Sequence, residues 1–161
     1  MEFQIAQLTN ESLKSLTPSE NKEILDMFRA MAKTDERFHV YKSESHISNP
    51  ELKSLKQLVV GGGSLIIVAD KETHELVGGC GFRVTDFDIL KQGAVSFVYT
   101  MPKYRKQGAA TAMFNKVNEI AKAAGCTELY ITVAAGNTEA INLYERVGFE
   151  PRIIQMLKGV R

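Results

Sequence analysis

The chain has 161 residues, 44% of them apolar, with 20 Lys and Arg side chains against 19 Asp and Glu and a formal net charge of +1. This is the composition of an ordinary globular domain that can bury a core without disulfides or metals, and it argues against dominant disorder. A charge so close to zero also argues against proteins that wrap duplex nucleic acid or coat anionic membranes, because both classes carry a basic excess. We therefore expect one domain over residues 1–161, with no nucleic acid and no membrane as partner.

Cysteine usage and hydropathy narrow the expected chemistry and location. Cys80 and Cys126 have no cysteine or histidine neighbour at ligand spacing, so we expect neither a metal site nor a disulfide framework. The longest uncharged stretch, residues 57–69, is too short to span a membrane, and the first residues lack the basic flank and apolar block of a secretory signal. These features favour a cytoplasmic location, where cysteines stay reduced.

The first part of the sequence predicts a strand, two helices and a hairpin. Residues 3–8 bracket a short alternating segment and predict the strand. Thr17–Glu20 predicts a helix start because it combines a cap residue, a proline at the first helical position and a glutamate three residues after the cap. Asn49–Glu51 is expected to open a second helix that runs to Val59 and ends at three glycines. The two strands expected to pair as an antiparallel hairpin are residues 65–69 and 76–84.

The second part of the sequence predicts strands that alternate with helices. Residues 86–92 are interpreted as a connection, after which strand and helix patterns follow each other. Gly125 and Gly148 come directly after the two helical patterns and predict where the helices end. The predicted elements are, in chain order, strand 94–101, helix 108–124, strand 129–133, helix 137–147 and the tail 149–157, which should close the sheet.

The turn between residues 101 and 110 has the features of an anion site. Small residues at the start of the following helix leave room for a phosphate to approach backbone N–H groups, whose partial positive charge favours it. A diphosphate is the natural guest of such a turn, and a simple solvated turn is the alternative. The sequence has neither the Ser or Thr that follows Gly-Lys in a Walker loop nor G-x-G-x-x-G at this turn, so triphosphate and dinucleotide folds lose support. The small residues are Gly108, Ala109 and Ala110, and the charged ones are Lys103, Arg105 and Lys106.

Two segments resemble the GNAT superfamily of acyl-coenzyme A dependent N-acetyltransferases. The family signature R/Q-x-x-G-x-G/A is matched by Arg105-Lys106-Gln107-Gly108-Ala109-Ala110. The pattern Asn137-x-x-Ala140-x-x-Leu143-Tyr144-x-x-x-Gly148-Phe149 is similar to the family's late helix, and the run Val98-Tyr99-Thr100-Met101-Pro102 fits the strand that precedes the signature. The resemblance covers roughly residues 76–149, so the half of the chain that would bind the acceptor carries less of it.

The resemblance implies a fold, a cosubstrate and a set of binding residues. The fold would be of the α/β class (α+β type), with a mixed, mostly antiparallel central sheet flanked by helices and a splayed parallel strand pair that forms the acetyl-coenzyme A (acetyl-CoA) cleft. Acetyl-CoA would be the cosubstrate and an amine the acceptor. The implied contacts are pantetheine with the backbone of Val98, Tyr99 and Thr100, pyrophosphate with Arg105, Lys106, Gln107, Gly108, Ala109 and Ala110, and the cleft wall with Asn137.

Tyr144 is the residue to which the resemblance assigns catalysis. The phenol, with an ordinary pKa of about 10, can protonate the departing coenzyme A thiolate, whose thiol titrates near 8.5 by analogy with cysteine. Core packing on an apolar helix stripe is the alternative role of this tyrosine. The implied reaction is direct attack of an amine on the thioester, with the two substrates held side by side.

The general base is not identified by the sequence. Related enzymes often carry a glutamate on the strand before the phosphate turn, but the corresponding segment, residues 94–99, contains no carboxylate. Either a water chain past Ser96 or a residue elsewhere would have to accept the proton. The candidates elsewhere are Asp86, Asp88, Glu44, His39 and His46, and the last two lie where the resemblance places the acceptor wall.

Two other functions remain open at this point. A catalytically silent acyl-CoA binding or sensing module would keep the phosphate turn and lack turnover, and the missing strand carboxylate favours it. A small nucleic-acid binding domain around Lys103–Lys106 is weaker, because three local charges form no extended stripe. The sequence leaves open whether the acceptor is a small molecule or a protein, and whether the chain is a monomer or a homodimer.

Overall fold

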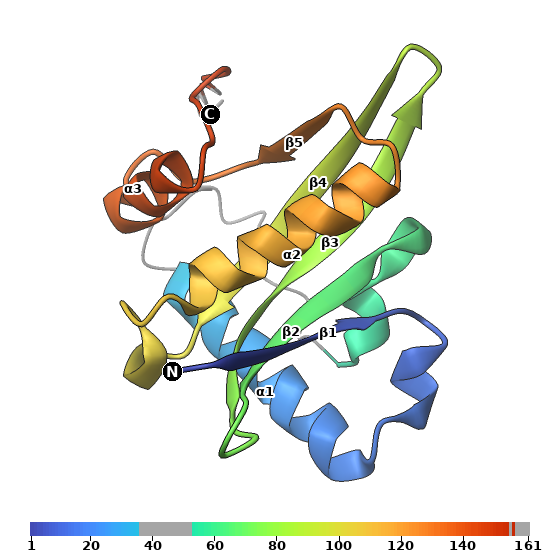
Figure 1. The fold of residues 1–161 in the computed structure, drawn as a ribbon, viewed down its shortest axis with the longest axis vertical. Coiled ribbons are helices and arrows are strands. Elements are labelled where there is room, and N and C mark those ends of the chain that lie inside the picture. Colours follow the sequence, from blue (N-terminus) through green and yellow to red (C-terminus); the bar gives the residue numbers. More distant parts are fainter. Residues whose placement is uncertain (36–52, 155, 157–161) are drawn as a thin grey trace, which may run out of the picture.

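One five-stranded sheet forms the centre of the computed structural model, which describes residues 1–35, 53–154 and 156 (Figure 1). The strands lie in the order in which they occur in the chain: β1 Phe3–Leu8, β2 Ser64–Asp70, β3 Leu76–Phe87, β4 Leu90–Thr100 and β5 Glu128–Ile131. The α-helices within the described residues are α1 Pro18–Asp35, α2 Ala109–Ala123 and α3 Thr138–Arg146. Short 3-10 turns are η1 Ser12–Ser15, η3 Leu55–Leu58, η4 Val60–Gly62 and η5 Pro102–Tyr104.

The sheet is mixed, as the sequence predicted. Strands β1 to β4 pair antiparallel, each with the next, and β4 pairs with β5 in parallel. A parallel pair needs a crossover connection, and here helix α2 supplies it. The predicted architecture, a mostly antiparallel sheet with one parallel pair and flanking helices, is confirmed.

Helix α1 begins at the pattern that predicted it. The Thr17 backbone N–H donates to Glu20 Oε2 at 2.8 Å and the Glu20 N–H donates to Thr17 Oγ1 at 3.2 Å, so a capping box closes the first turn. Pro18 stands at the first helical position, where its missing N–H leaves no bond unmade. None of the described helices is long and apolar enough to cross a membrane.

Two hydrophobic cores lie on opposite faces of the sheet. Successive residues of β2 alternate between them: Leu65 and Ile67 pack on the α1 side, whereas Ile66 and Val68 pack on the α2 side. In Figure 1, α2 crosses in front of the strands and α1 lies behind them. Because fully burying such a side chain contributes about 1.5–3 kcal/mol, the two faces together fix both helices against the sheet.

The β3–β4 connection differs from the prediction. The segment 86–92 does not form a long connection, because β3 extends to Phe87 and β4 begins at Leu90. The polar residues in this region still pair across the strands, and the Lys91 Nζ lies 3.8 Å from Asp86 Oδ2. Cross-strand pairs of opposite charge stabilise a ladder, so polarity alone does not indicate a loop here.

Two other predicted elements also differ. The described part of the predicted second helix contains the 3-10 turn η3, and η4 follows it at the glycines, while residues 49–52 lie outside the described residues. The tail does not close the sheet over residues 149–154, where no strand forms, and Ile153 and Ile154 are about nine-tenths exposed. Pro151 cannot donate a backbone hydrogen bond, which weakens any ladder that this segment would form.

Glycines in β3 allow the end of β4 to approach closely. A Cβ atom at Gly78 would lie 2.5 Å from the Tyr99 carbonyl oxygen, and one at Gly81 would lie 2.6 Å from Ser96 Oγ and 3.0 Å from the Phe97 ring. The contact at Gly78 is with backbone, which cannot rotate away as a side chain can. The spacing between β3 and the last part of β4 therefore requires glycine at residue 78.

We predict that Gly78→Ala lowers the free energy of unfolding by about 1–3 kcal/mol, because the added methyl group overpacks the contact with β4. Denaturant unfolding monitored by circular dichroism measures this change. Gly136→Ala is the matched control, since a Cβ there meets nothing within 4 Å and should change the stability by less than about 0.5 kcal/mol. Wild-type stability of the Gly78 variant would contradict the close approach of the strands.

Candidate active site

The parallel strands β4 and β5 separate in the middle of β4. They pair from Gln92 with Glu128 as far as Val95 with Ile131, and β5 ends there while β4 continues to Thr100. Figure 1 shows the chain after β5 turning away toward α3, while β4 runs on to the turn before α2. Along this last part of β4, the edge that β5 vacates has no strand bonded to it within the described residues. Backbone groups on that edge are therefore placed to bind a ligand.

A β-bulge lies where the strands separate. Gly79 pairs with Tyr99 and Gly81 with Ser96, so two residues of β4, Phe97 and Val98, lie opposite the single residue Cys80. An extra residue of this kind shifts the side-chain alternation of a strand by one position. Val95 accordingly packs on the α2 side of the sheet and Tyr99 on the α1 side.

Phe97 is strained and partly exposed at the bulge. Its φ of 53° lies in the left-handed region, which a bulky side chain adopts only when its surroundings impose it. Its ring approaches Gly81 on the α1 face of the sheet. The residue is 42% exposed, because α1 covers this face only further along β4. Ser96 is exposed as well. The sheet is thus open to solvent at the point where its two parallel strands part.

A groove lies on the α1 side of the sheet, near the end of β4. Leu76, Tyr99 and Met101 provide apolar surface from the sheet, and the groove is about 420 Å³ in volume. Its other wall is the stripe of α1 that contains Ser19, Lys22, Glu23, Asp26, Met27 and Ala30. Tyr99, one of the predicted coenzyme-binding residues, therefore turns its side chain into this groove, and its backbone remains on the strand edge.

The turn from β4 to α2 presents a helix start with open space in front of it. Gly108 is the N-cap of α2 at φ 88°, no side chain caps the helix, and a Cβ at this position would meet nothing within 4 Å. Ala109 is buried and Ala110 half-buried behind it. The first N–H groups of a helix have no intrahelical partner and carry partial positive charge, so this end of α2 can receive an anion.

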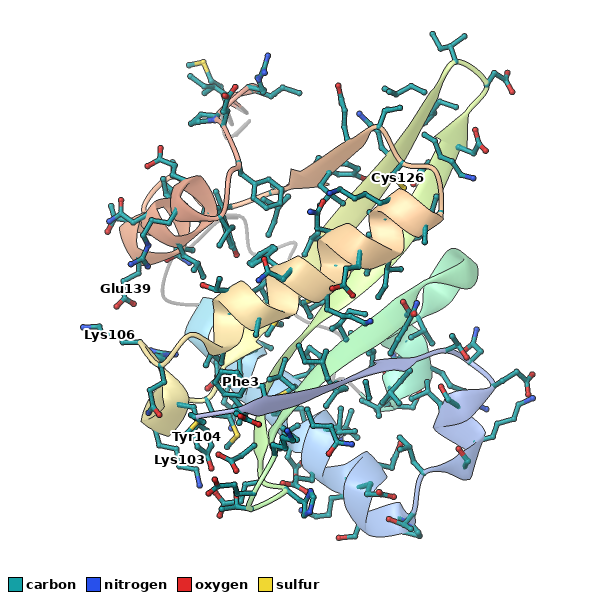
Figure 2. The ribbon with its side chains drawn as sticks, viewed as in Figure 1. Phe3, Lys103, Tyr104, Lys106, Cys126 and Glu139 are labelled. Atoms are coloured by element: carbon teal, nitrogen blue, oxygen red, sulfur yellow. The ribbon has the colours of Figure 1, made fainter. Side chains whose placement is uncertain are left out.

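The three basic residues of the turn do not act alike. The Lys103 Nζ donates to Glu75 Oε2 at 2.7 Å, so its charge is directed to the hairpin between β2 and β3. The Arg105 Nε donates to the Thr100 carbonyl at 3.2 Å, which folds the guanidinium back along the turn. Lys106, at a positive φ of 61°, extends away from the body of the protein (Figure 2). The sequence analysis named all three as charges that could attract an anion, and the structure gives one of them, Lys103, an acidic partner.

Glu75, Lys103 and Tyr104 form a hydrogen-bonded cluster under the turn. The Tyr104 hydroxyl also donates to Glu75 Oε2, and the Lys103 ammonium lies 4.7 Å from the Tyr104 ring centroid. Lys103 and Tyr104 hold the pKa of the Glu75 carboxyl below its ordinary value, and Glu75 raises the pKa of both partners. A lowered carboxyl pKa means that this contact stabilises the fold above the ordinary pKa and is lost as the pH falls through the lowered one.

Helix α3 carries the two remaining predicted site residues. Asn137 is its N-cap, and the Asn137 Oδ1 accepts from the Ala140 N–H at 3.2 Å, so the side-chain oxygen has a structural role. Tyr144 packs edge-to-face on Phe114 of α2, with ring centroids 5.7 Å apart, and on Phe149. The Tyr144 ring is therefore part of the contact between α3 and α2, as the packing alternative predicted, and this contact leaves its phenol half-buried.

The candidate bases fall into two groups. Asp86 pairs with Lys91 near the beginning of β4, and Asp88 lies in the adjacent turn. Lys91 is seven residues from Val98, which at ~3.3 Å per residue is a distance of ~23 Å along the strand. His39, Glu44 and His46 lie outside the described residues. Cys80 is fully buried, and burial raises the pKa of its thiol to about 12, so it remains a protonated packing residue.

Sequence reasoning missed Phe97 and Glu75. No sequence pattern marks a phenylalanine that will adopt a positive φ, because the bulge arises from the pairing of β3 with β4. The glycines at 78, 79 and 81 gave a signal of close approach on the neighbouring strand. Glu75 had no local signal, since its partners are 28 and 29 residues away.

Known proteins resemble this chain in sequence. Residues 18–149 match the model of the acetyltransferase (GNAT) family. Over 51 residues the chain is 41% identical to a protein of Mus musculus named thialysine N-epsilon-acetyltransferase. That segment is 32% of this chain and 30% of the mouse protein, so the match covers less than a third of the relative.

Solved structures resemble the chain over almost its whole length. A putative acetyl transferase from Pyrococcus furiosus superposes with a TM-score of 0.71 and 19% identity, covering 99% of this chain and all of that one. The ribosomal-protein-alanine N-acetyltransferase from Brucella melitensis biovar Abortus 2308 gives a TM-score of 0.70 with 15% identity and the same coverage. At such identities the likeness establishes the fold.

We predict that Phe97→Gly is more stable than Phe97→Ala by about 1 kcal/mol, because a left-handed φ costs a residue with a Cβ roughly 1–2 kcal/mol. At ordinary strand positions the order is reversed, since glycine there is less stable than alanine by roughly 0.5–1 kcal/mol. Urea unfolding of both variants gives the comparison. Tyr130, which is 41% exposed on the neighbouring strand, provides the matched pair Tyr130→Gly and Tyr130→Ala, which should keep the ordinary order. A more stable alanine variant at residue 97 would show that φ is not constrained there.

Proposed function

This chain belongs to the acetyltransferase (GNAT) family, and from that premise we propose that it transfers the acetyl group of acetyl-CoA to a primary amine of a small molecule or a protein. The observation that carries the proposal is the continuity of two backbone surfaces. The edge of β4 that β5 vacates beyond Val95 leads into the turn that ends at the uncapped start of α2. One extended ligand with a polar arm and a diphosphate can bind both surfaces at once.

The residues of the turn fit the phosphates of the proposed cosubstrate. The open space at Gly108 admits a phosphate to the first N–H groups of α2, and Ala109 and Ala110 add no bulk in front of them. Arg105, Lys106 and Gln107 would add polar contacts around the diphosphate, with Lys106 best placed because it extends outward. Lys103 is not included in this set, because Glu75 binds it.

The freed edge of β4 fits the pantetheine arm. Amide groups of the arm would bond the backbone of Val98, Tyr99 and Thr100, as one strand bonds another. The Thr100 carbonyl already accepts from Arg105, which leaves its second lone pair for a ligand. Asn137 would line the opposite side through its Nδ2 group, since its Oδ1 caps α3.

The proposed reaction is a direct transfer between two bound substrates. The amine nitrogen attacks the thioester carbonyl carbon, a carbon–nitrogen bond forms, and the carbon–sulfur bond breaks. We assign Tyr144 as the acid that gives its phenolic proton to the departing thiolate. Backbone N–H groups at the bulge would stabilise the developing oxyanion, and orientation of the two substrates would supply most of the acceleration.

The acceptor would approach from the α1 side of the sheet. Leu129 and Ile131 of β5 pack toward α2, so Tyr130 between them faces the α1 side, as Phe97 does. Both aromatic residues are more than two-fifths exposed, and Ser96 is exposed beside Phe97. A water at Ser96 could carry the amine proton away, because β4 has no carboxylate at this point.

A catalytically silent acyl-CoA binding module is the second candidate function. The absence of a carboxylate in residues 94–99 and the packing of the Tyr144 ring against Phe114 and Phe149 favour it. Both candidates require acetyl-CoA to bind, and they differ only in turnover. Release of free thiol in the presence of an amine panel separates them.

The first test is whether acetyl-CoA binds the purified protein, measured as the shift in the protein's melting temperature. A ligand at about 100 times its dissociation constant stabilises the folded state by roughly 2.7 kcal/mol, and NAD and ATP serve as controls. A shift that is specific to acetyl-CoA supports the cosubstrate. No shift at millimolar ligand would reject both candidates.

We predict that Gly108→Glu abolishes this binding, because its carboxylate fills the phosphate position and opposes the phosphate charge. Isothermal titration with acetyl-CoA measures the loss. Gly108→Asn is the matched control, since asparagine tolerates the left-handed φ of this position and adds no charge. The asparagine variant should bind within about tenfold of wild type. Wild-type affinity of the glutamate variant would remove the phosphate site from the proposal.

We predict that Tyr144→Phe lowers kcat about 10²-fold or more and leaves the acetyl-CoA dissociation constant nearly unchanged. The phenylalanine ring keeps the packing on Phe114, and the variant lacks the phenolic hydroxyl. Steady-state thiol release and calorimetric binding give the two quantities. Normal turnover in this variant would assign Tyr144 to packing alone.

A further inference from the structure

Glu75, the acidic residue of the cluster with Lys103 and Tyr104, lies outside both segments that match the family motifs. It directly precedes β3, at the end of the hairpin that connects β2 to β3, and one of its carboxylate oxygens accepts from both Lys103 and Tyr104. Figure 2 shows these two side chains pointing from the turn toward that hairpin. The contact therefore joins the phosphate turn to an element 28 residues earlier in the chain.

The other side-chain hydrogen bonds of the turn join residues only four or five positions apart in the chain. The Gln107 Nε2 donates to the Lys103 carbonyl at 2.9 Å, and the Arg105 Nε donates to the Thr100 carbonyl. Neither bond reaches further than Thr100, the last residue of β4, so neither ties the turn to another strand. Among the described side chains, Glu75 provides the polar link that fixes this connection to the rest of the sheet.

Tyr104 transmits this fixation to the start of α2. Its ring is buried in the same core as Ala109, the first residue of the helix, while its hydroxyl reaches Glu75. The backbone bond from the Met101 N–H to the Val77 carbonyl, at 2.9 Å, anchors the beginning of the turn. The turn is thus held at Met101 by backbone and at Tyr104 by Glu75, and Gly108 follows four residues later.

We propose that Glu75 is a positioning residue for the cosubstrate: through Tyr104 and Lys103 it fixes the turn so that the N–H groups at Gly108–Ala110 converge on the diphosphate. This inference rests on the proposed function. Glu75 itself does not touch the ligand, and its charge opposes that of a phosphate. Its effect on binding must therefore come from geometry, because a purely electrostatic effect of the carboxylate would weaken anion binding.

The two possible roles of Glu75 therefore predict opposite changes in acetyl-CoA affinity. Glu75→Ala removes a negative charge and frees Lys103, so an electrostatic role predicts tighter binding of acetyl-CoA. A positioning role predicts weaker binding. The dissociation constant should rise about tenfold if the stabilisation that the turn loses equals that of one charge-assisted hydrogen bond. Glu75→Gln should lie within about threefold of wild type, because its amide oxygen still accepts from the Tyr104 hydroxyl.

The experiment measures acetyl-CoA binding by calorimetry, together with KM and kcat for thiol release and the melting temperature of each variant. Glu75→Ala should raise the dissociation constant and KM about tenfold and change kcat by less than about twofold. Glu72→Ala, which removes the same charge from the same hairpin, is the matched control and should behave as wild type. A fall in melting temperature with unchanged KM would show a merely structural role and overturn the proposal.

Tyr104→Phe keeps the proposal testable if Glu75→Ala does not fold. The phenylalanine retains the buried ring and loses the bond to Glu75, so acetyl-CoA binding should weaken in the same direction. In the double variant the two effects should not add, because both remove one interaction. Additive effects, or tighter binding in either single variant, would overturn the proposal.

The failures of the two proposals are distinguishable. If the wild-type protein does not bind acetyl-CoA, the proposed function fails and the role of Glu75 fails with it. If wild type binds and the Glu75 and Tyr104 variants bind equally well, the proposed function stands and only the positioning role is rejected.

Discussion

Backbone hydrogen bonding between β4 and β5 ends at Val95 and Ile131, and the rest of the candidate site depends on this limit. A parallel ladder that continued to Thr100 would occupy the edge of β4 with another strand. Because it stops, the backbone groups on this edge of the last part of β4 have no strand bonded to them within the described residues. The bulge at Phe97 and Val98 falls directly after the last pair and turns the strand there.

Several rigid contacts hold this edge in place. Gly78 and Gly81 let β3 lie close to β4 on either side of the bulge, and the two hydrophobic cores pack on both faces of the sheet. The strain at Phe97 persists because these surroundings impose it. Backbone groups on a free strand edge are not fixed by a neighbouring strand on that side. Contacts from the rest of the sheet must therefore hold them in position.

The local parts of the fold were predictable because their signals are local. The capping box at Thr17 and Glu20, the alternation in β1 and the glycine after α2 each depend on residues within one or two turns. The predictions failed where a partner far along the chain decides. The polar ends of β3 and β4 extend as strands because they pair with each other, and the tail after Phe149 stays outside the sheet.

The sequence by itself determined the family and the turn at Arg105–Ala110, because motif spacing is a property of neighbouring residues, and the resemblance to that family implied the mixed sheet. It also placed Tyr144 on a helix face, where the apolar stripe favours packing and the resemblance to the family favours catalysis. Only the tertiary structure decided that Lys103 is bound by Glu75 and that Phe97 is held exposed at a positive φ. Each of these depends on a contact between elements, and a side chain's partner is set by the packing of the elements that carry it.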